Sequence, residues 1–223
     1  MSTNHQMNYY DYAKTLSAEG VMTALIGRGA GPEPEQHEYV DLGLPSGTLW
    51  ATCDIGANSP EEAGLYFAWG ETSGYTAEQV GTDKNFTWED YQLGNTNAPI
   101  DENNNLKPEY DAATANWGDG WRMPTKAEFE ELMTLPHKWD SSRRGYSFTD
   151  ANENELLFVF AGGYASGGNV YALSVGGHCR SGSFCHADVN GAWTLHFNSV
   201  RYIIDYGSCF IGYAVRPVRS QNL

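Results

Sequence analysis

The sequence predicts an α+β domain with short antiparallel strands, two main helices and large loops. The chain has 223 residues, of which 41% are hydrophobic, so it can form one domain with a substantial core. It also contains 25 glycines, and glycine weakens helix interiors while it supplies turn conformations. This composition favours a loop-rich fold over a helical bundle.

The first 36 residues differ from the rest and predict an appendage. Residues 9–26 carry an irregular apolar stripe that suits one helix. The segment GRGAGPEPEQ that follows is typical of a linker, because its Gly and Pro residues interrupt regular structure. We expect residues 1–36 to serve as an attachment segment or to be disordered, and residues 37–223 to form the domain.

The domain opens with a pattern of two short strands. Residues 38–44 and 48–56 have strand character, and the intervening Pro45-Ser46-Gly47 is a turn signal. These two segments are therefore expected to form a hairpin-like pair at the start of the domain.

Two helix starts follow. Ser59 suits an N-cap position and Pro60 the first helical position, which predicts a helix as far as about Ala68. Thr125 and Glu128 have the spacing of a capping box and precede an i, i+3, i+4 apolar stripe. The long stretch between these helices, residues 70–116, is expected to be a locally packed loop excursion.

The last third of the chain has the pattern of strands. Residues 156–164 are a buried strand candidate, residues 193–198 alternate apolar and polar, and residues 211–219 form the last candidate. We expect this last strand to pair near the first one, around residues 39–42.

The alternation in WTLHFN assigns side chains to faces. Trp193, Leu195 and Phe197 share one face and are expected to point to the core. Thr194 and His196 are then expected to face solvent, where substitutions have little effect on folding.

Charge and the distribution of apolar residues disfavour several classes of partner and of destination. A formal net charge of −15 disfavours nucleic-acid and anionic membrane partners. The longest apolar run is far too short to span a membrane. The first residues show neither a basic nor an apolar signal region, so we expect no secretory signal. Localisation stays open, with a virus particle or a cell surface as candidate destinations.

The segment 177–211 has an unusual alphabet. Its 35 residues contain no Lys, Glu, Gln or Met, whereas the other 188 positions hold 31 of them. At that rate about six would be expected in the segment. A solvated loop normally uses Lys and Glu freely. Exposure of the segment to solvent therefore does not explain why these residues are missing.

A coding argument does explain it. An Asn codon that is randomised at its two adenines can encode His, Cys, Arg, Asp, Tyr, Phe, Ile and several others. It cannot encode Lys, Glu, Gln, Met or Trp. Every residue of the segment except Trp193 belongs to the permitted set. The alternative is a loop rich in Gly and Ser with chance omissions.

Four separated blocks of the chain carry a family resemblance. They are EYVDLGLPSGTLWATCDIGANSPEEAGLYFAWGE, WGDGWRMPTKAEFEEL, FAGGY and GYAVRPVR, in that order between residues 38 and 219. Together they resemble the C-type-lectin-like superfamily in its formylglycine-generating-enzyme-like branch, and in particular the variable proteins of diversity-generating retroelements. That resemblance implies a C-type-lectin-like fold and adenine-directed mutagenesis of codons near the C-terminus.

The resemblance also implies a binding face that displays the variable residues. Its ligand would be an unknown protein or glycan on a target surface, such as the receptor of a phage. Large aromatic, His and Arg side chains suit such a face. The candidate contacts are His178, Cys179, Arg180, Phe184, His186, Asp188, Thr194, His196, Arg201, Tyr202, Ile203, Asp205, Tyr206 and Phe210.

Three alternatives remain open: an enzyme, a domain with a structural metal ion, and an adhesion domain without diversification. Formylglycine-generating enzymes use a cysteine pair, and Cys179 and Cys185 are near each other in sequence, but five residues separate them. Both cysteines also belong to the permitted set, and we expect all four cysteines of the chain to be free thiols. No cofactor is expected, although the Asp- and Asn-rich residues 97–111 could hold a structural calcium ion. A lectin-like adhesion domain without diversification is the third alternative.

Overall fold

The computed structural model describes residues 37–93, 99–118, 120–159, 163–172, 176–186 and 190–221. They belong to the second of the two units into which the chain divides, His37–Leu223. The helix expected at residues 9–26 lies outside the described residues. Within the described ranges, no helix has the length and apolarity needed to cross a membrane.

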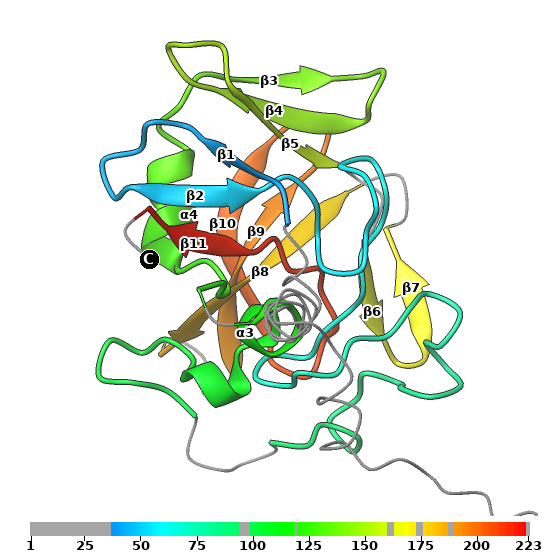
Figure 1. Cartoon of the computed structure of the whole chain (residues 1–223). Helices are drawn as coiled ribbons and strands as arrows, with labels where there is room; N and C mark the ends of the chain where they lie inside the picture. Colours follow the sequence, from blue (N-terminus) through cyan, green and yellow to red (C-terminus); the bar gives the residue numbers. More distant parts are fainter. Residues whose placement is uncertain are drawn as a thin grey trace, which may run out of the picture. The chain divides into compact units, whose positions relative to one another are not determined.

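The described residues form an α+β domain, as predicted, with small antiparallel sheets and two α-helices. Figure 1 shows their arrangement. The strands are β1 (Tyr39–Asp41), β2 (Thr48–Ala51), β3 (His137–Asp140), β4 (Gly145–Thr149), β5 (Glu155–Val159), β6 (Tyr164–Ser166), β7 (Asn169–Tyr171), β8 (Gly177–Cys185), β9 (Gly191–Phe197), β10 (Tyr202–Ser208) and β11 (Val218–Ser220). The helices are the 3-10 helix η1 (Pro108–Tyr110) and the α-helices α3 (Ala112–Trp117) and α4 (Lys126–Leu132).

The first sheet has the strand order β1-β2-β11. The predicted turn between β1 and β2 is confirmed, since the Gly47 amide donates to the Leu44 carbonyl at 2.9 Å. The last strand joins the same sheet as the first, as predicted, but it pairs with β2 and not with residues 39–42 of β1. Trp50 of β2 has Val40 on one side and Val218 on the other. The fully buried β2 takes the central position because both of its edges then find hydrogen-bond partners.

The helix predicted at 59–68 does not form. Its second half is extended, because the Phe67 amide and carbonyl both bond to the backbone of Tyr213. Gly64 also approaches Ile55 so closely that a Cβ atom there would lie 2.5 Å from the Ile55 carbonyl oxygen. The capping signal at the start therefore makes only a turn, and tertiary contacts decide the rest.

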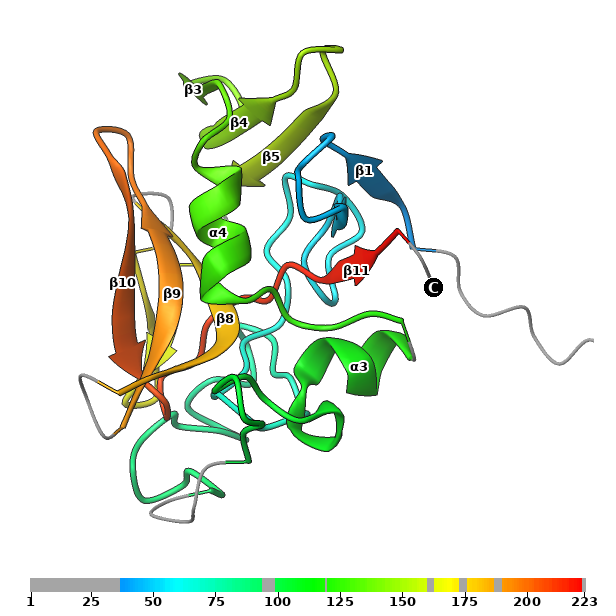
Figure 2. The same cartoon turned by 90° about the vertical axis from the view of Figure 1, so that its left-hand side faces the viewer.

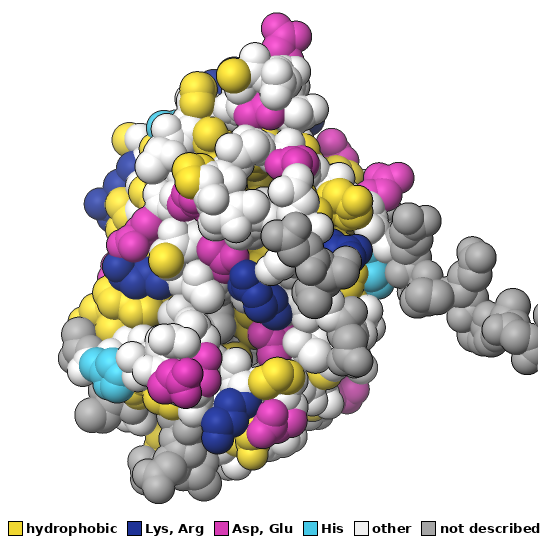
Figure 3. Space-filling model, turned by 60° about the vertical axis from the view of Figure 1, so that its left-hand side comes forward, with side chains coloured by type: hydrophobic (Ala, Val, Ile, Leu, Met, Phe, Trp, Pro, Cys, Tyr) yellow, Lys and Arg dark blue, Asp and Glu magenta, His cyan; other side chains and the backbone are white. Residues whose placement is uncertain are grey.

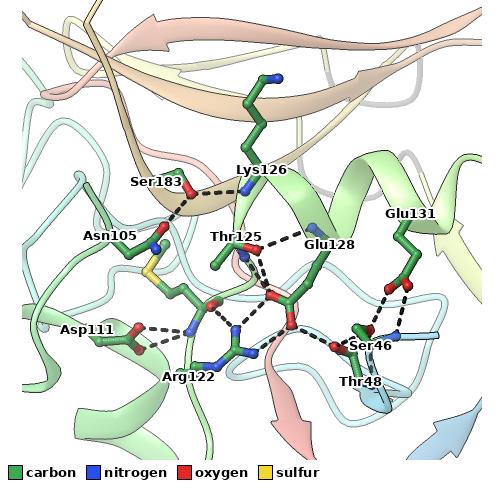
Figure 4. A network of polar contacts seen from close by, with 11 residues as sticks. Ser46, Thr48, Asn105, Asp111, Arg122, Thr125, Lys126, Glu128, Glu131 and Ser183 are labelled. Atoms are coloured by element: carbon green, nitrogen blue, oxygen red, sulfur yellow. Dashed lines mark hydrogen bonds and ion pairs between the residues drawn. The ribbon is translucent and has the colours of Figure 1, made fainter. Parts of the chain in front are cut away.

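The second predicted helix is confirmed as α4. Thr125 and Glu128 form a complete capping box, which satisfies two free amide donors at the helix start. The Glu128 carboxylate also accepts from Arg122 Nη2 and from the Thr48 hydroxyl, both at 2.6 Å. This buried network, drawn in Figure 4, ties the start of α4 to β2. The additional helix α3, which the sequence reading assigned to a loop excursion, begins at the N-cap Asp111.

The sheet with strand order β10-β9-β8 carries the segment with the unusual alphabet. Helix α4 lies against one face of this sheet, as Figure 2 shows. On that face Cys179, Leu195 and Phe197 join one core cluster, which also contains Phe129 of α4. The opposite face carries the side chains that alternate with these.

The C-terminal segment runs beside β8 before it reaches β11. The Arg180 amide donates to the Ala214 carbonyl at 2.8 Å. Arg216 is buried, and its Nε donates to Asp54 at 2.6 Å while its Nη1 donates to the Leu157 carbonyl at 2.9 Å. This segment therefore borders the β8 edge of the β10-β9-β8 sheet.

Candidate ligand-binding face

The structure describes thirteen of the fourteen predicted contacts, since Asp188 lies outside the described residues. Three of the thirteen are buried, which contradicts their expected exposure at the surface, although Thr194 still lines a pocket described below. Cys179 is 2% exposed, Arg180 0% and Thr194 2%. The other ten are half-buried or exposed.

Arg180 is buried because its side chain holds a backbone turn together. All its hydrogen bonds go to neutral acceptors at 2.8–3.2 Å. Its guanidinium carbon also lies 4.1 Å from the centroid of the Tyr213 ring. Burial lowers the pKa of this guanidinium. Its acceptors are the carbonyls of Ala192, Gly207, Ser208 and Ile211 and the hydroxyl of Thr194.

Thr194 and Cys179 are buried for different reasons. Thr194 was expected to face solvent, but its hydroxyl accepts from Arg180, which draws it beneath the surface. Cys179 points into the core on the α4 face, and its Sγ accepts from the Arg216 amide at 3.3 Å. Burial raises the pKa of the Cys179 thiol, which disfavours the thiolate.

Five predicted contacts meet in a pocket of about 390 Å³ on the face opposite α4, here called the histidine pocket. His178 of β8 lies opposite His196 of β9, with ring centroids 4.1 Å apart. The pocket is lined by Tyr164, His178, Thr194, His196, Asp205, Tyr206, Gly207, Ser208, Ile211 and Tyr213.

The two imidazoles of the histidine pocket are held in their neutral form. Burial, reinforced by the nearby His196 and Arg180, lowers the pKa of His178 to about 3. Burial and the charge of Arg201 lower the pKa of His196. At neutral pH both rings therefore offer one hydrogen-bond donor and one acceptor each.

A second pocket, of about 570 Å³, is here called the asparagine pocket. It contains the predicted contacts Phe184 and His186, and His186 Nε2 lies 2.7 Å from the Asn104 side-chain oxygen. Lys126 Nζ lies 4.7 Å from the centroid of a Trp193 ring. The pocket is lined by Asn103, Asn104, Asn105, Thr125, Lys126, Ala127, Glu130, Ser183, Phe184, His186 and Trp193.

A bulge in β8 positions the floor of the asparagine pocket. The register of β8 with β9 shifts between Arg180 and Phe184. Ser183 in this bulge accepts from the Lys126 amide at 2.9 Å and donates to the Asn105 side chain at 2.5 Å. Figure 4 shows Ser183 between these two residues. The bulge thus links β8, the start of α4 and the Asn-rich loop.

The remaining four predicted contacts line neither pocket. Tyr202 packs against His137, with ring centroids 4.3 Å apart, and Phe210 packs against Trp88. Arg201 is exposed in the turn before β10, and Ile203 is half-buried opposite His196. The thirteen described positions therefore do not form one continuous surface. Figure 3 shows exposed hydrophobic side chains interspersed with charged ones on one side of the molecule.

Sequence reasoning missed half of the histidine pocket. Tyr164 and Tyr213 come from β6 and from the segment after β10, far from β8 in sequence. Both belong to the blocks FAGGY and GYAVRPVR, which carry the family resemblance and supply none of the predicted contacts. Trp193 is expected on the core face but is only half-buried, and Lys126 Nζ lies over its ring.

The stretch considered for calcium supplies pocket residues. The Asp101 carboxylate accepts from the Asn103 and Asn105 amides at 2.8 and 2.9 Å, and so shapes the loop. In the described part of the chain, no three His, Cys, Asp or Glu side chains form a group that could hold a metal ion. None of the four cysteines forms a disulfide bond within the described residues.

Comparison of the chain with protein-family models, with curated proteins and with solved structures found no match. The fold and the geometry define the class: an α+β domain with two pockets beside its β10-β9-β8 sheet, the first built largely from segment 177–211 and the second shared between that segment, the Asn-rich loop and α4.

Proposed function

We propose that this protein binds a ligand through a C-type-lectin-like domain and is the variable protein of a diversity-generating retroelement. Residues of β8–β10 form its diversified binding face. The protein is displayed on a phage particle or a cell surface, with residues 1–36 as the attachment segment. Its partner is a protein or glycan on a target surface.

One observation carries this proposal. The segment that lacks Lys, Glu, Gln and Met supplies five predicted contacts to the histidine pocket and two to the asparagine pocket. In the same strands Leu195 and Phe197 are buried in the core. A sheet that separates core side chains from pocket side chains in this way tolerates changes on the pocket side.

The geometry also narrows the set of positions that diversification can use. Substitutions at exposed positions typically change stability by less than about 0.5 kcal/mol. Arg180 and Cys179 are buried and line neither pocket, and Thr194 is 2% exposed and bonded to Arg180, so changes at these three positions act mainly on folding. The variable contacts are therefore assigned to His178, Phe184, His186, His196, Asp205 and Tyr206.

Sequencing the gene and its downstream flank in many isolates tests the proposal. We expect differences at adenines of the codons for the pocket positions, matched by a nearby near-identical template, and constant codons for Leu195 and Phe197. A segment that is constant in all isolates, with no template nearby, would contradict diversification and leave a plain adhesion domain.

The formylglycine-generating-type oxidase is the weaker reading. Cys179 and Cys185 are both buried free thiols. Burial also raises the pKa of Cys179, whereas nucleophilic cysteines need an accessible thiolate. No second function is proposed for this pair.

A further inference from the structure

We infer that the histidine pocket binds a neutral, hydroxyl-rich ring, that is, a neutral sugar residue of a glycan. This inference rests on the proposed binding function and specifies the ligand class for one of the two pockets. It follows from the walls of the pocket, its charges and its unused hydrogen-bonding groups.

The walls of the pocket are aromatic on adjacent sides. The His178 ring centroid lies 5.2 Å from those of both Tyr164 and Tyr213, and 4.1 Å from that of His196. Tyr206, which is 46% exposed, also lines the pocket. The inner rings pack on one another, and the exposed Tyr206 ring can pack against the C–H face of a ligand ring. A volume of about 390 Å³ is in the range of small-ligand pockets.

The charges of the pocket favour a neutral ligand. The buried guanidinium of Arg180 lies behind the wall and bonds to Thr194, whereas the carboxylate of Asp205 is in the lining. These two charges are opposite, and both imidazoles are neutral at neutral pH. Arg180 already occupies one face of the Tyr213 ring. An anionic ligand would meet the Asp205 carboxylate, and the positive charge of Arg180 behind the wall reduces the attraction of the lining for a cation.

Several hydrogen-bonding groups of the pocket are available to hydroxyls. The Nδ1 atom of His178 is buried and has no hydrogen-bond partner among the described residues. A buried polar atom without a partner costs free energy, and a ligand hydroxyl would remove that cost. The Asp205 carboxylate and the Ser208 hydroxyl offer an acceptor and a further donor at the same pocket.

Saturation-transfer NMR on the full chain tests this assignment directly. The probes are glucose, galactose, mannose, fucose and N-acetylglucosamine, each at millimolar concentration. We expect transfer to the ring protons of at least one neutral sugar, and at least a tenfold loss of affinity in Asp205→Asn and in His178→Ala. The matched control Asp83→Asn removes an exposed carboxylate that lines neither pocket, and should leave the signal unchanged.

The contrary outcomes are distinct. Absence of transfer from all five sugars, or transfer that persists in both pocket variants, would overturn the assignment. N-acetylneuraminic acid and choline are measured at the same concentration as charged probes. Transfer from only one of these two would overturn the assignment in favour of an acidic or a cationic ligand. Thermal unfolding of each variant shows whether a lost signal reflects misfolding. Asp205 is exposed on β10, so Asp205→Asn still tests the pocket if His178→Ala fails to fold. The codon survey decides diversification separately.

Discussion

His178 of β8 and His196 of β9 face each other directly across the sheet, with ring centroids 4.1 Å apart and planes inclined by 31°. The contact depends on the antiparallel register of two strands that the sequence separates by a loop. It places two titratable rings next to the buried charge of Arg180. This arrangement has consequences for stability, for substitution and for chemical reactivity.

The first prediction concerns pH. The folded-state pKa of His178 is about 3 against 6.5 for the free side chain. Between these values the unfolded chain binds a proton that the folded chain does not. The contribution of the neutral His178 ring to the free energy of unfolding is therefore complete above pH 6.5, and it is lost as the pH falls toward 3. Between pH 7 and pH 4.5, we expect the free energy of unfolding of the wild type to fall by on the order of 2 kcal/mol more than that of His178→Gln.

Urea unfolding of the wild type and His178→Gln at pH 7, 5.5 and 4.5 measures this difference. Carboxylates that titrate in the same range contribute equally to both proteins and cancel. Parallel dependence on pH in the two proteins would show that His178 is protonated in the folded state as readily as in the unfolded chain.

The second prediction concerns Arg180. Truncation by Arg180→Ala leaves the carbonyls of Gly207, Ser208 and Ile211 without a buried donor. Each unsatisfied buried group costs about 1–3 kcal/mol, so we expect a loss of at least about 3 kcal/mol in the free energy of unfolding. The exposed Arg201→Ala should change it by less than about 0.5 kcal/mol. Equal effects in denaturant titrations would contradict the role of Arg180 as a structural anchor.

The third prediction separates the two faces of β9. Leu195 is 1% exposed and belongs to the core on the α4 face, so Leu195→Ala should cost about 2–5 kcal/mol. Its neighbour His196 lines the histidine pocket, and His196→Ala should cost less than about 1 kcal/mol at pH 7. Thermal or denaturant unfolding measures both values, and the reverse order would mean that β9 presents the opposite face to the core.

The fourth prediction concerns the thiols. Cys179, Cys185 and Cys209 are buried, whereas Cys53 is half-buried. In the native protein we expect one thiol to react readily with a disulfide reagent such as DTNB, and three more to react only on unfolding. Peptide mapping of the labelled protein identifies the site. Fast native labelling at Cys179 or Cys185 would reopen the oxidase alternative.

Local sequence patterns predicted the elements whose causes are local. The Thr125–Glu128 capping box produces α4, because both of its hydrogen bonds join residues three positions apart. The turn before β2 likewise depends on the adjacent residues 45–47. The helix expected at 59–68 failed for the opposite reason. Its amide and carbonyl at Phe67 bond to Tyr213, which no local pattern reveals.

The sequence by itself determined the α+β class, the α4 helix, the strand pattern of WTLHFN and the odd alphabet that marks segment 177–211. Only the tertiary structure decided which members of that segment are accessible. Alternation assigns Thr194 and His196 to one face, yet Arg180 buries the first and leaves the second in a pocket. Burial depends on what packs across a strand from distant parts of the chain, and side-chain periodicity within the strand does not contain that information.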